Sequence, residues 1–104
     1  MYTIIETAIF EKYAADAWEA DELEAFKVWL ALHPYAGDVI PKSGGCRKVR
    51  WSSTGKGKRG GARVIYFNQL DNGIIVLLIV YTKTKFDNLP TEFLKRLKEV
   101  AEHG

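Results

Sequence analysis

Residues 62–82 read ARVIYFNQLDNGIIVLLIVYT, and this stretch decides the fold. It contains two runs rich in β-branched and aromatic residues, 62–68 and 74–82, each of the length of a strand. Between the runs, Asp71-Asn72-Gly73 includes an Asn-Gly pair, which is a strong signal for a short turn between antiparallel strands. We therefore predict two antiparallel strands joined by this turn.

Two further strands are expected before this stretch, over 2–5 and 46–52. Because side chains alternate between the two faces of a strand, the second of these strands presents two separate sets of residues. One face is predicted to carry Cys46, Lys48 and Arg50, and the other Arg47, Val49 and Trp51. The glycine-containing segments at 35–45 and 53–61 are predicted to be loops.

Three segments have the apolar spacing of amphipathic helices: 8–16, a second segment that ends before Pro34, and 90–101. The second helix is predicted to begin at a capping box formed by Asp21 and Glu24. The predicted order is β-α-α-β-β-β-α. This is an α+β fold, a small antiparallel sheet with two N-terminal helices and one C-terminal helix.

Length and composition exclude several classes of protein. A chain of 104 residues, 47% of them apolar, suits one compact domain over 1–104. No apolar run approaches the roughly 20 residues of a membrane span, and the sequence shows no signal peptide, so we expect a cytoplasmic protein. Cys46 has no partner for an internal disulfide, and two histidines, His33 and His103, offer little for a metal centre or a Ser-His-Asp triad. We expect neither a metal nor a cofactor.

Charge is distributed very unevenly along the chain, although the net charge is only +2. Residues 1–41 hold two basic and eight acidic residues, a net charge of −6, while residues 71–104 hold five of each. Residues 42–70 hold eight basic residues and no acidic one, a net charge of +8. This segment predicts a polyanionic partner more strongly than the overall charge does.

Three of these cations are predicted to gather on one surface. Lys48 and Arg50 share a face of their strand, and Arg63 lies at the start of the next strand, so pairing of the two strands brings all three together. Like charges at such short range oppose folding, which makes a purely structural role a poor explanation. The alternatives are compensation by acidic residues elsewhere in the chain and a solvated strand edge.

The loop between these two strands has Gly55, Gly57 and Gly60 in a G-x-G-x-x-G spacing. A dinucleotide site needs a helix directly after this motif, and a strand is predicted there, so we reject that interpretation. The glycines instead allow the loop cations to reach a phosphate backbone, and these cations are Lys56, Lys58 and Arg59. The alternative is a basic loop that only aids solubility.

Metal-independent RNA cleavage is the chemistry that such a set of cations can support. RNA supplies its own nucleophile, the 2′-OH, which must lose its proton while the leaving 5′-oxygen gains one. Arg50 and Arg63 suit the stabilisation of the charged phosphorane. Lys48 or Lys83 is the candidate for proton transfer, provided that neighbouring cations and partial burial favour loss of its proton. Tyr81 is a candidate for stacking on a base, with packing in the sheet as the alternative.

Three stretches together carry a family resemblance: Gly44-Gly45-x-Arg47-Lys48-Val49-Arg50, Gly55-Lys56-Gly57-Lys58-Arg59-Gly60-Gly61-x-Arg63, and Tyr81-x-Lys83. They resemble the HigB-type branch of the RelE/ParE toxin superfamily, and the resemblance spans nearly the whole chain. It implies a bacterial type II toxin, an endoribonuclease that cleaves mRNA in the A site of the ribosome. The catalytic residues that it implies are Lys48, Arg50, Arg63 and Lys83, and the expected RNA-binding residues are Arg47, Lys56, Lys58, Arg59, Tyr81 and Lys85.

The same resemblance implies a cognate antitoxin, which we expect to be a helix-turn-helix DNA-binding protein that covers or distorts the basic face. The resemblance does not assign the general base, because Thr84 and Lys85 stand where an arginine is common and no tyrosine follows Tyr81. Two other functions stay open. One is inhibition of DNA gyrase, as in ParE-like proteins, and the other is non-catalytic binding to RNA or the ribosome.

Overall fold

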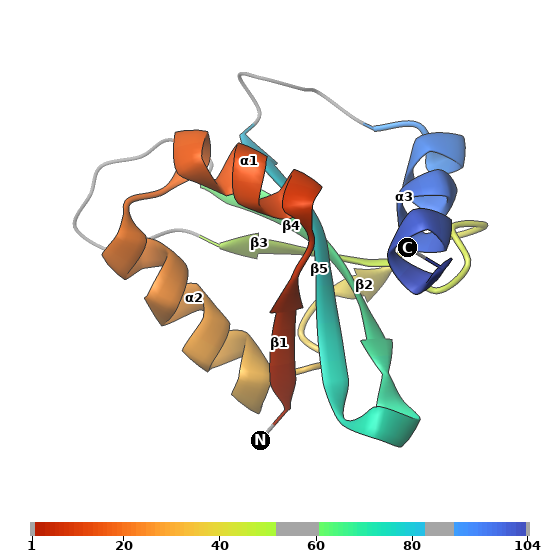
Figure 1. The fold of residues 1–104 in the computed structure, drawn as a ribbon, viewed down its shortest axis with the longest axis horizontal. Coiled ribbons are helices and arrows are strands. Elements are labelled where there is room, and N and C mark those ends of the chain that lie inside the picture. The colour runs from red at the N-terminus through yellow and green to blue at the C-terminus, as the bar shows by residue number, and fades with distance from the viewer. Residues whose placement is uncertain (1, 52–60, 83–88, 104) are drawn as a thin grey trace.

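A five-stranded sheet forms the centre of the molecule (Figure 1). The computed structural model describes residues 2–51, 61–82 and 89–103. The strands are β1 (Thr3–Glu6), β2 (Asp38–Val39), β3 (Arg47–Trp51), β4 (Ala62–Gln69) and β5 (Ile74–Thr82). They lie in the order β1-β5-β4-β3-β2, and every neighbouring pair is antiparallel except β1 and β5.

The predicted pair of strands at 62–82 is confirmed, because β4 and β5 pair antiparallel from end to end, with one shift of register between Ile65 and Tyr66. A 3-10 turn, Leu70–Asn72, joins them, and Gly73 adopts a φ of 66° directly before β5. That backbone conformation is open to glycine at little steric cost. The Asn-Gly signal thus marks the position of the connection correctly.

The α+β class is confirmed, while the predicted sheet needs two corrections, one in the direction of a strand and one in the number of strands. The sheet is mixed, because β1 lies parallel to β5 at one edge. The expected loop 35–45 also contains β2, which pairs with only two residues of β3. A strand of two residues is too short for an alternating pattern to be recognised in the sequence.

The helices cover the two faces of the sheet with separate cores. α1 (Ala8–Ala17) and α2 (Ala20–Leu32) pack on one face, where Phe10, Phe26 and Leu30 meet apolar residues of β3, β4 and β5. α3 (Thr91–His103) packs on the opposite face through Leu94 and Leu97. The sheet therefore separates two helical layers (Figure 1). Within the part of the chain that the structure describes, no helix has the length and apolar character to cross a membrane.

The start of α2 lies two residues before the predicted capping box. Glu19 is the N-cap, and its side chain and that of Glu22 form the reciprocal bonds of a capping box. The prediction of Asp21 and Glu24 in these roles is therefore wrong. Carboxylates stand at 19, 21, 22 and 24, so the pairs 19/22 and 21/24 both have the spacing of a capping box. The structure uses the pair that contains Glu22, which is buried.

Candidate nucleic-acid interface

Two arginines face each other directly across the pair β3 and β4. Arg50 lies opposite Arg63, and Arg63 lies opposite Tyr81 of β5, so the three side chains form a row across three strands. Cβ atoms of directly opposed residues are about 4.5–5.5 Å apart, and like charges at that distance are destabilising. The row is therefore a place where a bound anion would relieve repulsion.

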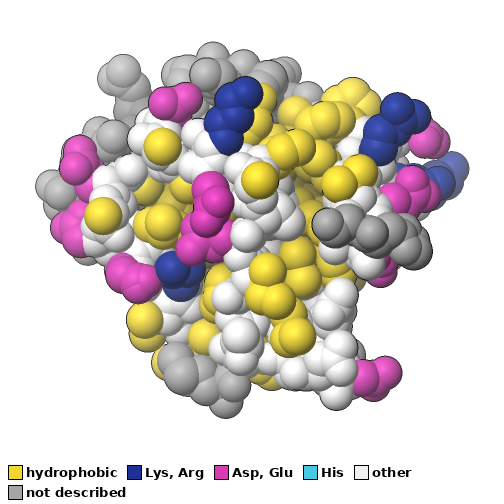
Figure 2. Space-filling model, in the orientation of Figure 1, with side chains coloured by type: hydrophobic (Ala, Val, Ile, Leu, Met, Phe, Trp, Pro, Cys, Tyr) yellow, Lys and Arg dark blue, Asp and Glu magenta, His cyan; other side chains and the backbone are white. Residues whose placement is uncertain are grey.

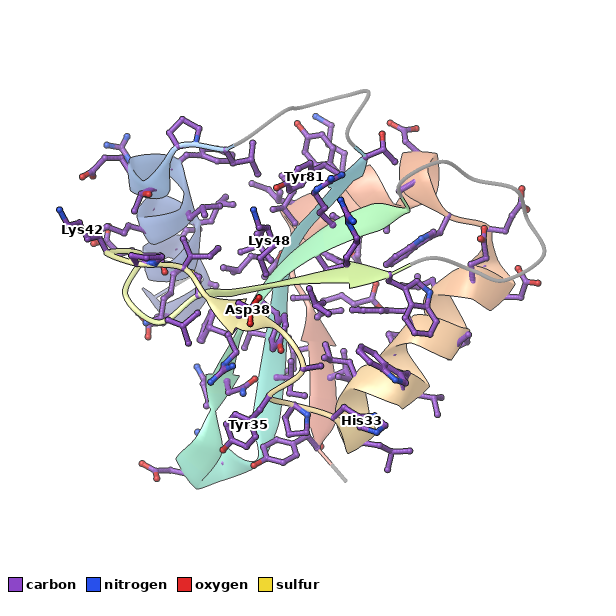
Figure 3. The ribbon with its side chains drawn as sticks, turned by 180° about the vertical axis from the view of Figure 1, so that it is seen from behind. His33, Tyr35, Asp38, Lys42, Lys48 and Tyr81 are labelled. Carbon is purple, nitrogen blue, oxygen red and sulfur yellow. The ribbon has the colours of Figure 1, made fainter. Side chains whose placement is uncertain are left out.

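Lys48 lies two residues before Arg50 and so on the same face of β3. Its side chain is exposed, and its partner in the register of β2 is Asp38 (Figure 3). Sequence reasoning missed Asp38 as a neighbour of this set, because β2 itself was not predicted. Among the described residues, 2–51, 61–82 and 89–103, the basic residues that form ion pairs are Lys27 and Lys98. Lys48, Arg50 and Arg63 form none with this part of the chain.

The burial and hydrogen bonding of one guanidinium nitrogen of Arg63 are unusual for a charged group. Its Nη1 is buried and has no hydrogen-bond partner among the described residues, although the side chain as a whole is partly exposed. A buried donor without an acceptor costs about 1–3 kcal/mol, and more when the group is charged. An anionic oxygen at this position would supply the missing acceptor and form a charge-assisted hydrogen bond.

Tyr81 closes the row on the side of β5 but is only 3% exposed. It belongs to the core beneath α3, together with Ile65, Ile79 and Leu94. Burial raises the pKa of its phenol, and the positive charge of Arg63 acts in the opposite direction. The buried ring cannot stack on a base in this conformation, so its placement favours the packing alternative over the predicted role in RNA binding.

Arg47 points to the other face of β3, as the alternation predicts. Its Nη1 donates to the backbone oxygens of Gly37 at 2.6 Å and Tyr35 at 3.5 Å, and its guanidinium lies 5.1 Å from the centre of the Tyr35 ring. These contacts fasten the loop before β2 to the sheet. Arg47 is therefore separated from Lys48 and Arg50, and its contacts favour a structural role over the expected binding of RNA.

The same loop sets the position of Lys48 through its backbone. The hydroxyl of Tyr66 accepts from the amide of Gly37 at 2.9 Å and donates to the oxygen of Pro34 at 2.9 Å. A Cβ atom at Gly37 would lie 2.8 Å from the backbone oxygen of Lys48. Only a residue without a side chain permits so close an approach.

The remaining candidate residues cannot be placed. Lys56, Lys58 and Arg59 lie in the segment 52–60, and Lys83 and Lys85 lie in the segment 83–88, and both segments are outside the described residues. Of the four predicted catalytic residues, the structure thus brings together Lys48, Arg50 and Arg63. Across the described ranges, no three His, Cys, Asp or Glu side chains are arranged to hold a metal ion.

Comparison with known proteins identifies a fold and no sequence family, since no family model matches this chain. The chain is similar to a double arginine-to-alanine mutant of the Escherichia coli toxin RelE in the free state, with a TM-score of 0.62 and 14% identity over 93% of this chain and 96% of that one. It is also similar to a chain of the intact E. coli RelBE toxin-antitoxin complex, with a TM-score of 0.57 and 16% identity over 79% of this chain and 96% of that one.

A third similar structure is a metal-bound toxin from Helicobacter pylori, with a TM-score of 0.50 and 14% identity over 83% of this chain and 99% of that one. At these identities the likeness concerns the fold. The chain therefore has the α+β fold of RelE toxins, which the sequence resemblance led us to expect. The narrower HigB-type assignment stays a prediction.

Proposed function

We propose that the protein is the toxin of a type II toxin-antitoxin system, an endoribonuclease that cleaves mRNA in the A site of the bacterial ribosome. The observation that carries the proposal is the Arg50–Arg63 pair on one sheet face, with the buried Nη1 of Arg63 lacking an acceptor among the described residues. RNA phosphate is an anion of suitable charge and geometry for two guanidinium groups. The RelE-like fold supports the same class of protein.

In the proposed reaction the 2′-oxygen of RNA attacks the adjacent phosphorus, and the bond from phosphorus to the 5′-oxygen breaks. Arg50 and Arg63 bind the non-bridging oxygens, where negative charge increases in the transition state. Lys48 is exposed beside them and binds phosphate or exchanges a proton with solvent. Because Lys48 is exposed, it lacks the burial that the sequence hypothesis assumed, and the general base is left unassigned.

A cognate antitoxin is part of the proposal. The fold is shared with a chain of the RelBE complex, in which toxin and antitoxin are bound to each other. We expect the partner of this chain to be a helix-turn-helix protein that covers or distorts the face of Lys48, Arg50 and Arg63. The complex would form in the bacterial cytoplasm, where ribosomes and mRNA are present.

Cleavage mapping in cells tests the proposal. After induction of the protein, primer extension on cellular mRNA should show cuts inside translated reading frames, and the cuts should disappear from a message without a start codon. Arg63→Ala and Lys48→Ala should each lower the cleavage rate by about 10²–10³-fold, as does loss of a donor to transition-state charge in other enzymes. Both variants should keep the far-UV circular dichroism and the melting temperature of the parent protein within a few degrees.

Lys95→Ala is the matched control, because it removes one exposed lysine of α3 and should leave cleavage unchanged. Full growth arrest by both site variants would contradict the assignment of the site. Halted translation with intact messages would indicate occlusion of the ribosome, and DNA damage with unbroken RNA would indicate the alternative action on gyrase.

A further inference from the structure

We propose that Tyr81 is a positioning residue, whose buried ring holds the guanidinium of Arg63 toward the phosphate site. The proposal rests on the proposed function, because it explains how one of its phosphate-binding groups is oriented. It gives Tyr81 a role that differs from the base stacking expected from the sequence. Tyr81 would touch Arg63 and not the RNA.

The sheet leaves Arg63 few directions in which its side chain can lie. On the β3 side its direct neighbour is Arg50, whose like charge repels it. On the β5 side its direct neighbour is Tyr81, which is 3% exposed and fixed in the core below α3. Along its own strand the next residue on this face is Ile65, which is also buried. Arg63 is therefore flanked across the sheet by a repelling cation on one side and by a buried aromatic ring on the other.

The proposed role of Tyr81 accounts for the state of the guanidinium. Nη1 of Arg63 is shielded from solvent without an acceptor among the described residues. Tyr81 is the direct partner of Arg63 in the register of β4 and β5, and the positive charge of Arg63 acts on its phenol, lowering the pKa that burial raises. A donor held in a low-dielectric place interacts more strongly with an arriving phosphate than a solvated donor does.

Substitution of the ring tests this role. Tyr81→Leu keeps an apolar residue at the position but removes the flat ring, and Tyr81→Phe keeps the ring. We expect Tyr81→Leu to slow single-turnover cleavage on programmed ribosomes by about tenfold, because a misplaced group about 1 Å from its productive position can cost up to 10²-fold. Tyr81→Phe should restore at least half of the parent rate. In an Arg63→Ala background, Tyr81→Leu should cause no further loss, because both changes act through one group.

Phe67→Leu is the matched control for destabilisation. Phe67 is a buried aromatic residue of the same core, but its partner on β5 is Val76, far along the strands from Arg63. It should lower the melting temperature about as much as Tyr81→Leu does and leave the cleavage rate within twofold of the parent. A tenfold loss in Phe67→Leu, or a Tyr81→Phe variant as slow as Tyr81→Leu, would overturn the proposal.

A measurement without RNA separates this proposal from the proposed function. Side-chain NMR of ¹⁵N-arginine-labelled protein reports hydrogen exchange at Nε–H of Arg63, which should be several-fold faster in Tyr81→Leu than in the parent, Tyr81→Phe and Phe67→Leu. Unchanged exchange in Tyr81→Leu would overturn the positioning role even if the protein cleaves mRNA. Faster exchange in a protein without ribonuclease activity would instead reject the proposed function and leave the orientation of Arg63 by Tyr81 in place.

Discussion

Arg63 combines two local costs that a residue selected for stability alone would avoid. It stands opposite a second arginine, which costs about 0.2–1 kcal/mol, and one of its nitrogens is buried without an acceptor among the described residues. Replacement of buried ionic groups by apolar ones is often neutral or stabilising. The presence of both arginines on this face is therefore easier to explain by binding of an anion than by folding.

Cys46 is a buried residue of the same face, and it leads to a prediction about pH. Its thiol lies in the core below α3, and burial raises its pKa above the ordinary value of 9.0. The unfolded chain then loses this proton at a lower pH than the folded chain does. Stability is fully present below about pH 9 and falls as pH rises toward the folded pKa, by at most about 1.4 kcal/mol per pH unit for one proton.

We expect the free energy of unfolding in urea to decline between pH 9 and 10, and Cys46→Ala to flatten this part of the curve. Cys46→Ala also removes a buried sulfur and lowers stability at every pH, so the test is the slope and not the height of the curve. Tyr66 and Tyr81 have pKa values raised by burial from 10.0, so they add to the decline mainly near and above pH 10, and they do so equally with and without Cys46. An equal slope between pH 9 and 10 in both proteins would contradict the prediction.

At the scale of elements, the start of α2 depends on one buried carboxylate. Glu22 is 4% exposed, and its Oε1 accepts from the amide of Glu19 at 3.1 Å. Glu22→Ala removes this bond and leaves the amide without its acceptor, which should cost about 1–2 kcal/mol. Asp21→Ala removes a carboxylate from the same helical turn but not from the cap, and should cost at most about 0.5 kcal/mol.

Urea unfolding of the two variants measures this difference directly. Since both substitutions remove one negative charge near the same helix end, the net charge is matched. A larger loss in Asp21→Ala than in Glu22→Ala would favour the capping box that the sequence indicated and would contradict the structural one.

The elements that sequence analysis predicts well are those whose pattern is long. β5 is predicted with its observed bounds because nine consecutive strand-forming residues precede Lys83, and β4 follows from the same hairpin. The alternation over 46–52 also places Lys48 and Arg50 together on one face, opposite Val49. The register that sets Arg50 against Arg63 is a property of two paired strands, so it is absent from the pattern of either strand alone.

Features that depend on contacts between distant parts of the chain cannot be predicted from such local patterns. β1 pairs in parallel with a strand about 70 residues away, and no local pattern records the direction of such a pairing. The burial of Tyr81 depends on where α3 packs, because tyrosine suits both a core and a binding surface. For this reason the sequence pattern predicts that Lys48 and Arg50 share one face, while it leaves the role of Tyr81 open.

In the whole molecule, the uneven charge of the sequence becomes an uneven charge of the surface. Figure 2 shows acidic side chains along the side of α1 and α2 and further ones on the side of α3. Lys48, Arg50 and Arg63 lie on the sheet face that α3 covers in part. Separated charge of this kind orients an approaching polyanion and repels it from the acidic side. The molecule should therefore bind RNA in one preferred orientation.

Salt dependence tests this electrostatic picture with a probe that cannot react. A short 2′-O-methyl RNA binds phosphate-recognising groups but lacks the nucleophile for cleavage. Each phosphate that the protein neutralises on a single strand contributes about −0.7 to the slope of log K against log salt concentration. Fluorescence anisotropy should therefore show a steep negative slope for the parent protein, less steep by about 0.7 in Arg50→Ala. Lys95→Ala lowers the net charge by the same amount through an exposed lysine of α3, outside strands β3 and β4, and should leave the slope unchanged. A flat response, or an equal change in both variants, would mean that RNA binding does not depend on the Arg50–Arg63 face.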